Sequence, residues 1–127
     1  MTTKFSPVEL SKAVTVSAPD GSRVDILAQN GRGSMARFSL DPHTVSKAVR
    51  HRTVQELWYI VAGIGEMWLS DSRGEEIIAL APGLSLSIPT GTSFQFRSLG
   101  DAPLEAIGVT MPPWPGMDEA EFVPGKW

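Results

Sequence analysis

The chain has 127 residues, of which 42% are hydrophobic and 20% charged, and its formal net charge is -3 at pH 7. These values are ordinary for one globular domain with one hydrophobic core, and they exclude a disordered chain. The weakly acidic balance, without a concentrated basic face, argues against a nucleic-acid partner, since such proteins gather Lys and Arg on one surface.

The chain contains no cysteine, which excludes disulfide bonds, thiolate catalysis and cysteine-ligated metals. Residues 1–10 lack the hydrophobic stretch of a secretory signal. The most hydrophobic segment, residues 57–65, is too short to cross a bilayer and is broken by glycine. We therefore expect a cytoplasmic protein with no membrane partner.

The first element in chain order is a short helix near residues 7 to 12. Ser6 can cap this helix, Pro7 suits its first position, and Glu9 can complete a capping box. The helix is expected to lie at the periphery of the fold.

After this helix, short alternating hydrophobic runs are separated by turn residues such as Asn30-Gly31 and Pro82-Gly83. Strands at a spacing of about ten residues are typical of a sandwich or barrel. We expect one domain over residues 1–127, with its core at about 23–111 and a Pro- and Gly-rich tail at 112–127. The predicted strands cover residues 23–29, 34–40, 45–53, 56–62, 65–71, 75–80, 84–88, 93–98 and 104–111.

Alternation within the strands assigns side chains to faces. Glu56 begins a strand face that continues with Trp58 and Ile60, and a carboxylate on such a face needs a polar partner, water or a metal. In a later strand, Gln95 and Arg97 lie on the face opposite the neighbouring phenylalanines, where we expect solvent or a dimer contact.

The spacing between residues 51 and 98 resembles the two-part signature of the cupin superfamily. In the first motif, His51 precedes Glu56 by four intervening residues, and Gly63 follows Glu56 after six more. In the second motif, Gly83 is followed by five residues and then by Pro89-Thr90-Gly91. The resemblance implies an all-β fold, the double-stranded β-helix or cupin jelly-roll barrel, with the short N-terminal helix outside it.

In typical cupins, two histidines and the glutamate of the first motif hold a divalent metal together with a histidine of the second motif. Here Val49 and Phe94 occupy two of the three histidine positions, so only His51 and Glu56 remain as ligands. Two protein ligands seldom hold a first-row metal tightly, so we expect no cofactor. The alternative is a divalent transition metal bound by these two residues.

Three further residues are candidates for substitute ligands. Thr53 and Ser93 carry neutral hydroxyls, which are poor metal ligands. His43 follows Asp41-Pro42, a sequence that predicts a turn rather than an inward-pointing side chain.

The resemblance places His51 and Glu56 inside the barrel, where they are the candidate catalytic and ligand-binding residues. Glu56 would orient the imidazole of His51 and raise its pKa. The alternative is that His51 is a buried neutral histidine, hydrogen-bonded to Glu56 or to water. The pair could transfer protons, or it could be the relic of a lost metal site. Trp58, Phe94 and Phe96 would line the rest of the pocket, and the ring at position 94 favours an apolar or aromatic ligand over a highly charged one.

Three functions therefore remain open. The preferred one is a cupin that binds a small molecule and holds no firm metal. The others are a metal-dependent cupin enzyme of the dioxygenase or isomerase type, and a metal-free isomerase or cyclase that uses the His51–Glu56 pair. Fold alone does not choose among them. By resemblance the chain is also expected to form a homodimer, which would cover strand edges and the aromatic tail.

Overall fold

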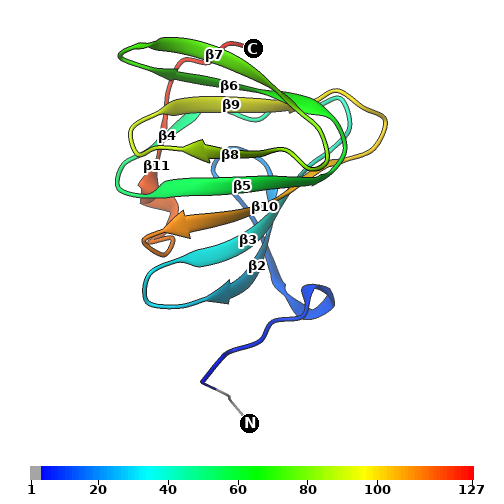
Figure 1. The fold of residues 1–127 in the computed structure, drawn as a ribbon, viewed down its shortest axis with the longest axis vertical. Helices are drawn as coiled ribbons and strands as arrows, with labels where there is room; N and C mark the ends of the chain where they lie inside the picture. Colours follow the sequence, from blue (N-terminus) through cyan, green and yellow to red (C-terminus); the bar gives the residue numbers. More distant parts are fainter. Residues whose placement is uncertain (1–3) are drawn as a thin grey trace.

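Two antiparallel sheets face each other across a hydrophobic interior in the computed structural model, which describes residues 4–127 (Figure 1). The six-stranded sheet has the order β1 (Val14–Ser17), β2 (Arg23–Gln29), β3 (Ser34–Leu40), β10 (Leu104–Met111), β5 (Gln55–Ala62) and β8 (Ser85–Ile88). The five-stranded sheet has the order β11 (Ala120–Phe122), β4 (Val49–His51), β9 (Ser93–Ser98), β6 (Gly65–Asp71) and β7 (Gly74–Leu80). The all-β prediction is confirmed.

Most strands lie where the alternating pattern predicts them, but the strand predicted at 45–53 is shortened to β4. Before β4, Val45 makes only an isolated bridge to Arg97. Ser46 then holds the chain to β9, since its N–H donates to the Phe96 carbonyl and its hydroxyl accepts the Phe96 N–H. Two strands, β1 and β11, were not predicted.

The predicted N-terminal helix is reduced to a single 3-10 turn at Leu10–Lys12. Its N-cap is Glu9, which makes no side-chain capping bond, and Ser6 has a positive φ of 47° instead of a capping conformation. The turn buries none of its residues. A helix this short is not stable without tertiary packing, so local capping signals alone do not extend it.

The motif glycines occupy turns that require them. Gly63, Gly83 and Gly91 have φ values of 81°, 96° and 82°, which L side chains rarely adopt. At Gly63 an added Cβ would also clash with the Pro103 carbonyl oxygen. The glycine spacing of the two motifs therefore follows from the tight connections between neighbouring strands.

The C-terminal tail packs on the outer side of β9. Gln95 accepts hydrogen bonds from the N–H groups of Lys126 and Trp127, and its amide donates to the carbonyls of Ser46 and Trp127. The guanidinium of Arg97 lies 4.1 Å from the centre of the Trp127 ring. The outward face of this strand, expected to meet solvent or a partner, instead contacts the chain's own tail.

Side chains fill one half of the space between the sheets. Ile60, Met67, Leu80, Ile88 and Phe96 pack there, each no more than 2% exposed. The other half, toward β1, β2 and β3, remains open and holds the candidate site. No helix within residues 4–127 is long and hydrophobic enough to span a membrane.

Candidate functional site

A cavity of about 270 Å³ lies between the two sheets at the end where the tail returns. Strands β1, β2, β3, β4, β5, β9 and β10 contribute to its wall, and the tail closes it with Trp114 and Met117. The volume is close to the lower end of the range for small-molecule pockets. Four of the five predicted pocket residues line it, namely His51, Glu56, Trp58 and Phe94.

Phe96 is the predicted pocket residue that does not line the cavity. Its ring is 2% exposed and packs edge-to-face on Trp58, with the centroids 5.1 Å apart. It therefore belongs to the filled half of the interior. Period-two alternation gives the direction of a side chain, but it does not give its depth along the barrel.

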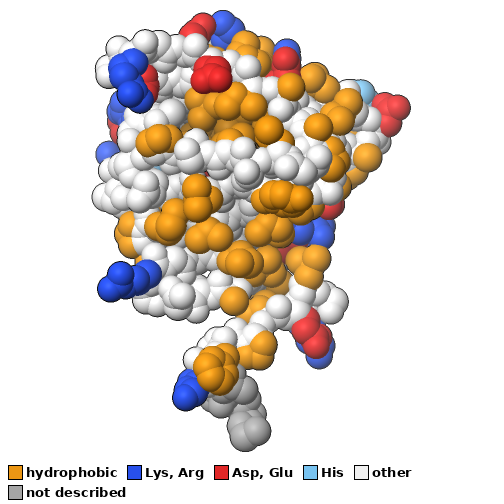
Figure 2. Space-filling view, in the orientation of Figure 1, with side chains coloured by type: hydrophobic (Ala, Val, Ile, Leu, Met, Phe, Trp, Pro, Cys, Tyr) orange, Lys and Arg blue, Asp and Glu red, His pale blue; other side chains and the backbone are white. Residues whose placement is uncertain are grey.

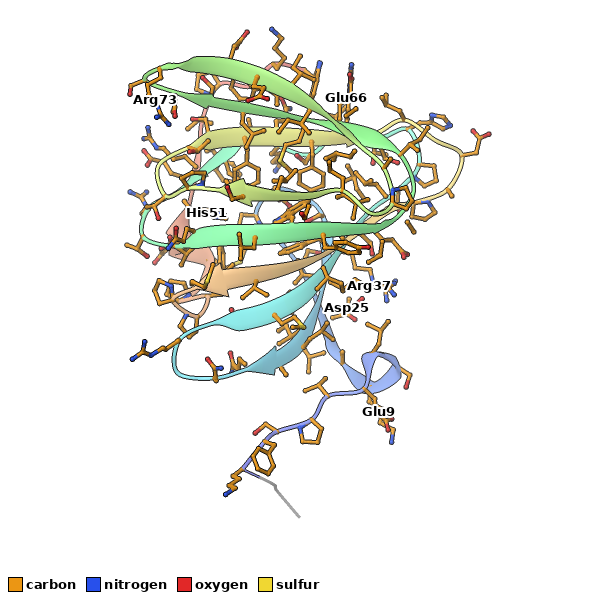
Figure 3. The ribbon with its side chains drawn as sticks, in the orientation of Figure 1. Glu9, Asp25, Arg37, His51, Glu66 and Arg73 are labelled. Atoms are coloured by element: carbon orange, nitrogen blue, oxygen red, sulfur yellow. The ribbon has the colours of Figure 1, made fainter. Side chains whose placement is uncertain are left out.

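His51 and Glu56 come together at the wall of the cavity. His51 lies on β4 and pairs with Ala120 of β11, which places its ring near the returning tail (Figure 3). Its Nδ1 lies 3.4 Å from Oε1 of Glu56, and the two side chains are 7% and 3% exposed. This Nδ1 is buried without a hydrogen-bond partner. Oε2 of Glu56 accepts a hydrogen bond from the indole N–H of Trp58.

Burial sets the protonation states of this pair. Desolvation lowers the pKa of His51 to about 4, although the charge of Glu119 acts in the opposite direction. Desolvation also raises the pKa of Glu56 to about 7, against the bond from Trp58 and with help from the charge of Asp20. The expectation that Glu56 would raise the pKa of His51 is therefore wrong, since removal from water outweighs pairing. Near pH 7 the imidazole of His51 is therefore neutral, and the carboxyl group of Glu56 is present in both its protonated and its ionised form.

Aromatic rings make up much of the cavity wall. Phe38 stacks on Trp58 with centroids 5.0 Å apart, whereas Phe94 and Trp114 both contact His51 edge-on, at 5.2 and 5.1 Å. Gly108 permits the stacked pair, because an added Cβ would lie 2.5 Å from the Phe38 ring. The imidazole is thus held between two rings.

Asp20 and Trp114 line the cavity, although the sequence predicts neither of them as a pocket residue. Asp20 is buried in the turn between β1 and β2, and its Oδ1 accepts bonds from the N–H and hydroxyl of Ser22 at 2.9 and 2.6 Å. Burial raises its pKa, against the bonds from Ser22. Trp114 is held beside the cavity by its backbone N–H, which donates a hydrogen bond to the Ser34 hydroxyl. An Asp-Gly turn and a Pro-rich tail carry no signal that separates such residues from ordinary loops.

Glu119 supports the site from the tail. It accepts bonds from the N–H groups of Thr53 and Val54 and from the Thr53 hydroxyl, at 2.6 to 2.8 Å. Burial alone would raise the pKa of Glu119, but these three bonds and the charge of His51 lower it. Thr53, a candidate substitute ligand in the sequence, thus serves to anchor the tail.

The donors present do not fit the divalent metal of typical cupins. Val49 and Phe94, at two of the histidine positions, are 1% and 2% exposed and carry no donor atom. His43 adopts the predicted turn, with φ 57°, and its Nε2 contacts Asp101 on the surface. Within residues 4–127, no three His, Cys, Asp or Glu side chains are grouped so that they could hold a metal ion.

Comparison with known sequences identifies relatives for the central part of the chain. The family described as the cupin domain matches residues 36–110. The xanthan biosynthesis protein XanB of Xanthomonas campestris pv. campestris is 28% identical over 95 residues, which make up 75% of this chain and 20% of that protein. The chain therefore spans about a fifth of the length of this curated relative.

Similar solved structures extend the likeness to the whole barrel. KdgF from Halomonas sp. has a TM-score of 0.69 at 19% identity, over 84% of this chain and 93% of the other. Pac13 of Streptomyces, described as a nucleoside dehydratase, has a TM-score of 0.74 at 14% identity, over 95% and 92% of the two chains. CapF from Staphylococcus aureus, a capsular polysaccharide assembling protein, has a TM-score of 0.70 at 17% identity, over 87% and 31%.

At these identities the structural likeness concerns the fold alone, and it agrees with the arrangement of two facing sheets. The family match covers more than half of the chain and includes His51, Glu56 and the glycines of both motifs. This chain belongs to the cupin family.

Proposed function

We propose that this chain binds a small organic molecule in the cavity beside His51 and does so without a firmly held metal. The observation that carries the proposal is the unpartnered Nδ1 of His51, a buried polar atom at the wall of a cavity. A buried nitrogen without a partner is costly, and a ligand that bonds to it would recover that free energy. Aromatic walls and a few convergent polar groups are the usual composition of such sites.

The related proteins support a small-molecule ligand. Pac13 has been determined with uridine, so a barrel of similar shape accommodates a nucleoside. XanB and CapF are described by the polysaccharides that they help to make. These descriptions concern other proteins at low identity, and they favour small-molecule binding over a purely structural role without naming the ligand.

The test uses the four tryptophans as reporters. Trp58 and Trp114 line the cavity, whereas Trp68 and Trp127 do not. The indole N–H of Trp58 and that of Trp68 each donate to a glutamate, so these two form a matched pair. In two-dimensional NMR spectra with EDTA present, a screen of small ring compounds should shift the Trp58 and Trp114 indole signals and leave the Trp68 signal in place.

A blocking variant provides the control for this screen. Ala36 lines the cavity and Ala79 is exposed on β7, so Ala36→Phe should abolish the shifts while Ala79→Phe keeps them. Shifts of all four signals, or none with any compound, would refute the binding proposal. Shifts that require an added divalent metal would favour the metal-dependent alternative.

A second candidate function is metal-free acid–base catalysis by the same pair. It is favoured by the 3.4 Å approach of His51 to Glu56 and by a Glu56 pKa of about 7. A catalytic acid or base works best when its pKa lies near the working pH. Glu56 would then give or take the proton while the neutral imidazole accepts a hydrogen bond. The pH dependence of unfolding of Glu56→Gln and His51→Asn tests the protonation states on which this candidate depends.

A further inference from the structure

The cavity wall carries acidic side chains but no Lys or Arg side chain. Asp20 and Glu56 both line it, and they are 9% and 3% exposed. None of the chain's eleven Lys and Arg residues, all of which lie within residues 4–127, is among the lining residues. The cavity therefore contains two buried carboxyl groups and no cationic side chain.

Neither carboxyl group is neutralised by another part of the described chain. Asp20 is bonded to Ser22, and Glu56 is bonded to the indole of Trp58. His51 approaches Glu56 but is itself neutral at pH 7, since burial lowers its pKa to about 4. With no cation beside them among residues 4–127, burial raises the pKa of both groups, so a ligand's ammonium group would be the first cation to pair with them.

A polar atom of the cavity wall is also suited to accept a hydrogen bond. Nδ1 of His51 has no hydrogen-bond partner, and a neutral imidazole with its proton on Nε2 has an acceptor at Nδ1. The hydroxyls of Ser34 and Thr110, which also line the cavity, hydrogen-bond to each other. His51 therefore offers an acceptor without a donor, and a ligand with N–H groups would supply the missing donor.

The walls favour positive charge as well. Phe38, Trp58, Phe94 and Trp114 line the cavity, and the face of an aromatic ring attracts a cation. A metal ion would need a set of closely grouped donors, and no such set is present among residues 4–127. An organic ammonium group needs only acceptors and rings.

We propose that the cavity selects ligands that carry a protonated amine, with Asp20 and Glu56 providing the opposite charge and Nδ1 of His51 accepting one N–H. This inference rests on the proposed small-molecule binding and adds the chemical class of the ligand. It assigns Asp20 a role in ligand binding. Phosphorylated compounds and sugar acids should bind most weakly, because the cavity offers their anionic groups no cationic side chain.

The test compares probes of equal shape and different charge. Benzylamine, benzyl alcohol and benzoate form one set, and phenethylamine, 2-phenylethanol and phenylacetate form another. Binding is followed by the Trp58 and Trp114 indole signals at pH 6. Each amine should bind at least about tenfold more tightly than its alcohol, as expected when a cation–π contact and a buried charge pair act together, and the acids should bind most weakly.

Two charge-removing variants test the residues. Asp20→Asn and Glu56→Gln keep the side-chain shape, and each should reduce the preference for amine over alcohol to about twofold or less while alcohol binding is retained. Asp101→Asn and Glu76→Gln are matched controls, because both residues are exposed and lie outside the cavity. The controls should keep the full preference.

A measurement on the wild type tests the proposal even if the variants do not fold. Amine binding should release a proton from the buried carboxyl groups at pH 6, seen by calorimetry in buffers of different ionisation enthalpy, and alcohol binding should release none. Equal affinity for amines and alcohols, or a preference for the acids, overturns the amine proposal and leaves small-molecule binding intact. If no probe of any charge shifts the two signals but uridine does, the amine proposal also fails. If nothing binds, both proposals fail.

Discussion

At the scale of single residues, burial rather than pairing governs the chemistry of the site. The side chains of His51 and Glu56 are 7% and 3% exposed, so each carries a large desolvation penalty when charged. The pKa of His51 falls to about 4 and that of Glu56 rises to about 7, with burial the largest cause in both. Folding therefore removes a proton from the histidine and keeps one on the glutamate over much of the acidic range.

These shifts predict opposite pH dependences of stability. The folded protein binds the Glu56 proton more tightly than the unfolded chain, so the Glu56 contribution is lost as the pH rises from about 4.5 to about 7. The unfolded chain binds the His51 proton more tightly, so the His51 contribution improves as the pH rises from about 4 to about 6.5. In the intact protein the two slopes largely cancel.

Glu56→Gln and His51→Asn should separate the two slopes in urea unfolding between pH 4 and pH 7.5. The difference in the free energy of unfolding between the wild type and Glu56→Gln should fall as the pH rises. The difference between the wild type and His51→Asn should rise with pH. Each difference should change by on the order of 3 kcal/mol over the whole titration. Slopes of the same sign in both comparisons would contradict a neutral His51 beside a protonated Glu56.

At the scale of elements, one glutamine holds the last residues of the tail on the barrel. The buried side chain of Gln95 makes four hydrogen bonds, three with the tail backbone and one with Ser46. Gly125 allows this approach, since an added Cβ would lie 2.6 Å from Oε1 of Gln95. The same tail supplies Trp114 to the cavity and Glu119 to the turn before β5. Attachment of the tail and formation of the cavity are therefore linked.

Gln95→Ala should lower the free energy of unfolding by about 2 to 3 kcal/mol, because buried carbonyl and N–H groups lose their partners. Gln55→Ala, at an exposed position of β5, should cost less than about 0.5 kcal/mol. Hydrogen exchange of the Lys126 and Trp127 amides should become faster in the first variant only. Equal exchange rates in both variants would show that the tail is held by other contacts.

At the scale of the whole molecule, exposed hydrophobic surface remains on the outer face of the six-stranded sheet. Leu57, Tyr59 and Val61 of β5 are 51%, 51% and 40% exposed, and Tyr59 pairs with the half-buried Ile107 of β10. Figure 2 shows hydrophobic side chains in several groups across the middle of the visible face. Such a surface is typical of a protein contact. The tail, in contrast, is engaged by its own barrel, so the expected homodimer would use this sheet face.

Light scattering coupled to gel filtration should give twice the monomer mass for the wild type. Tyr59→Glu should shift the mass to that of a monomer, because it places a charge in the centre of the interface. Ser72→Glu, exposed in the turn between β6 and β7, adds the same charge elsewhere and should leave the dimer intact. A monomeric wild type would refute the prediction, and a dimer that persists in Tyr59→Glu would move the interface to another face.

The class of the fold and the inward direction of two polar residues follow from the amino-acid sequence alone. Alternation predicts β2, β3, β6, β9 and β10, because a half-buried strand must place hydrophobic side chains on every second position. The motif glycines mark turns with positive φ, and the resemblance to cupins places His51 and Glu56 on inward faces, where both side chains are buried. These features are local, so the sequence records them directly.

Where the interior stays open, and what surrounds the His51–Glu56 pair, depends instead on tertiary packing. The cavity is the space that side chains from seven strands and the tail leave unfilled, and no local sequence pattern predicts where such a space remains. Asp20 and Trp114 reach it from segments far from His51 in sequence, and Phe96 misses it although it shares a strand face with Phe94. The pKa shifts likewise depend on burial by many distant residues, which is why pairing alone predicted the wrong direction for His51.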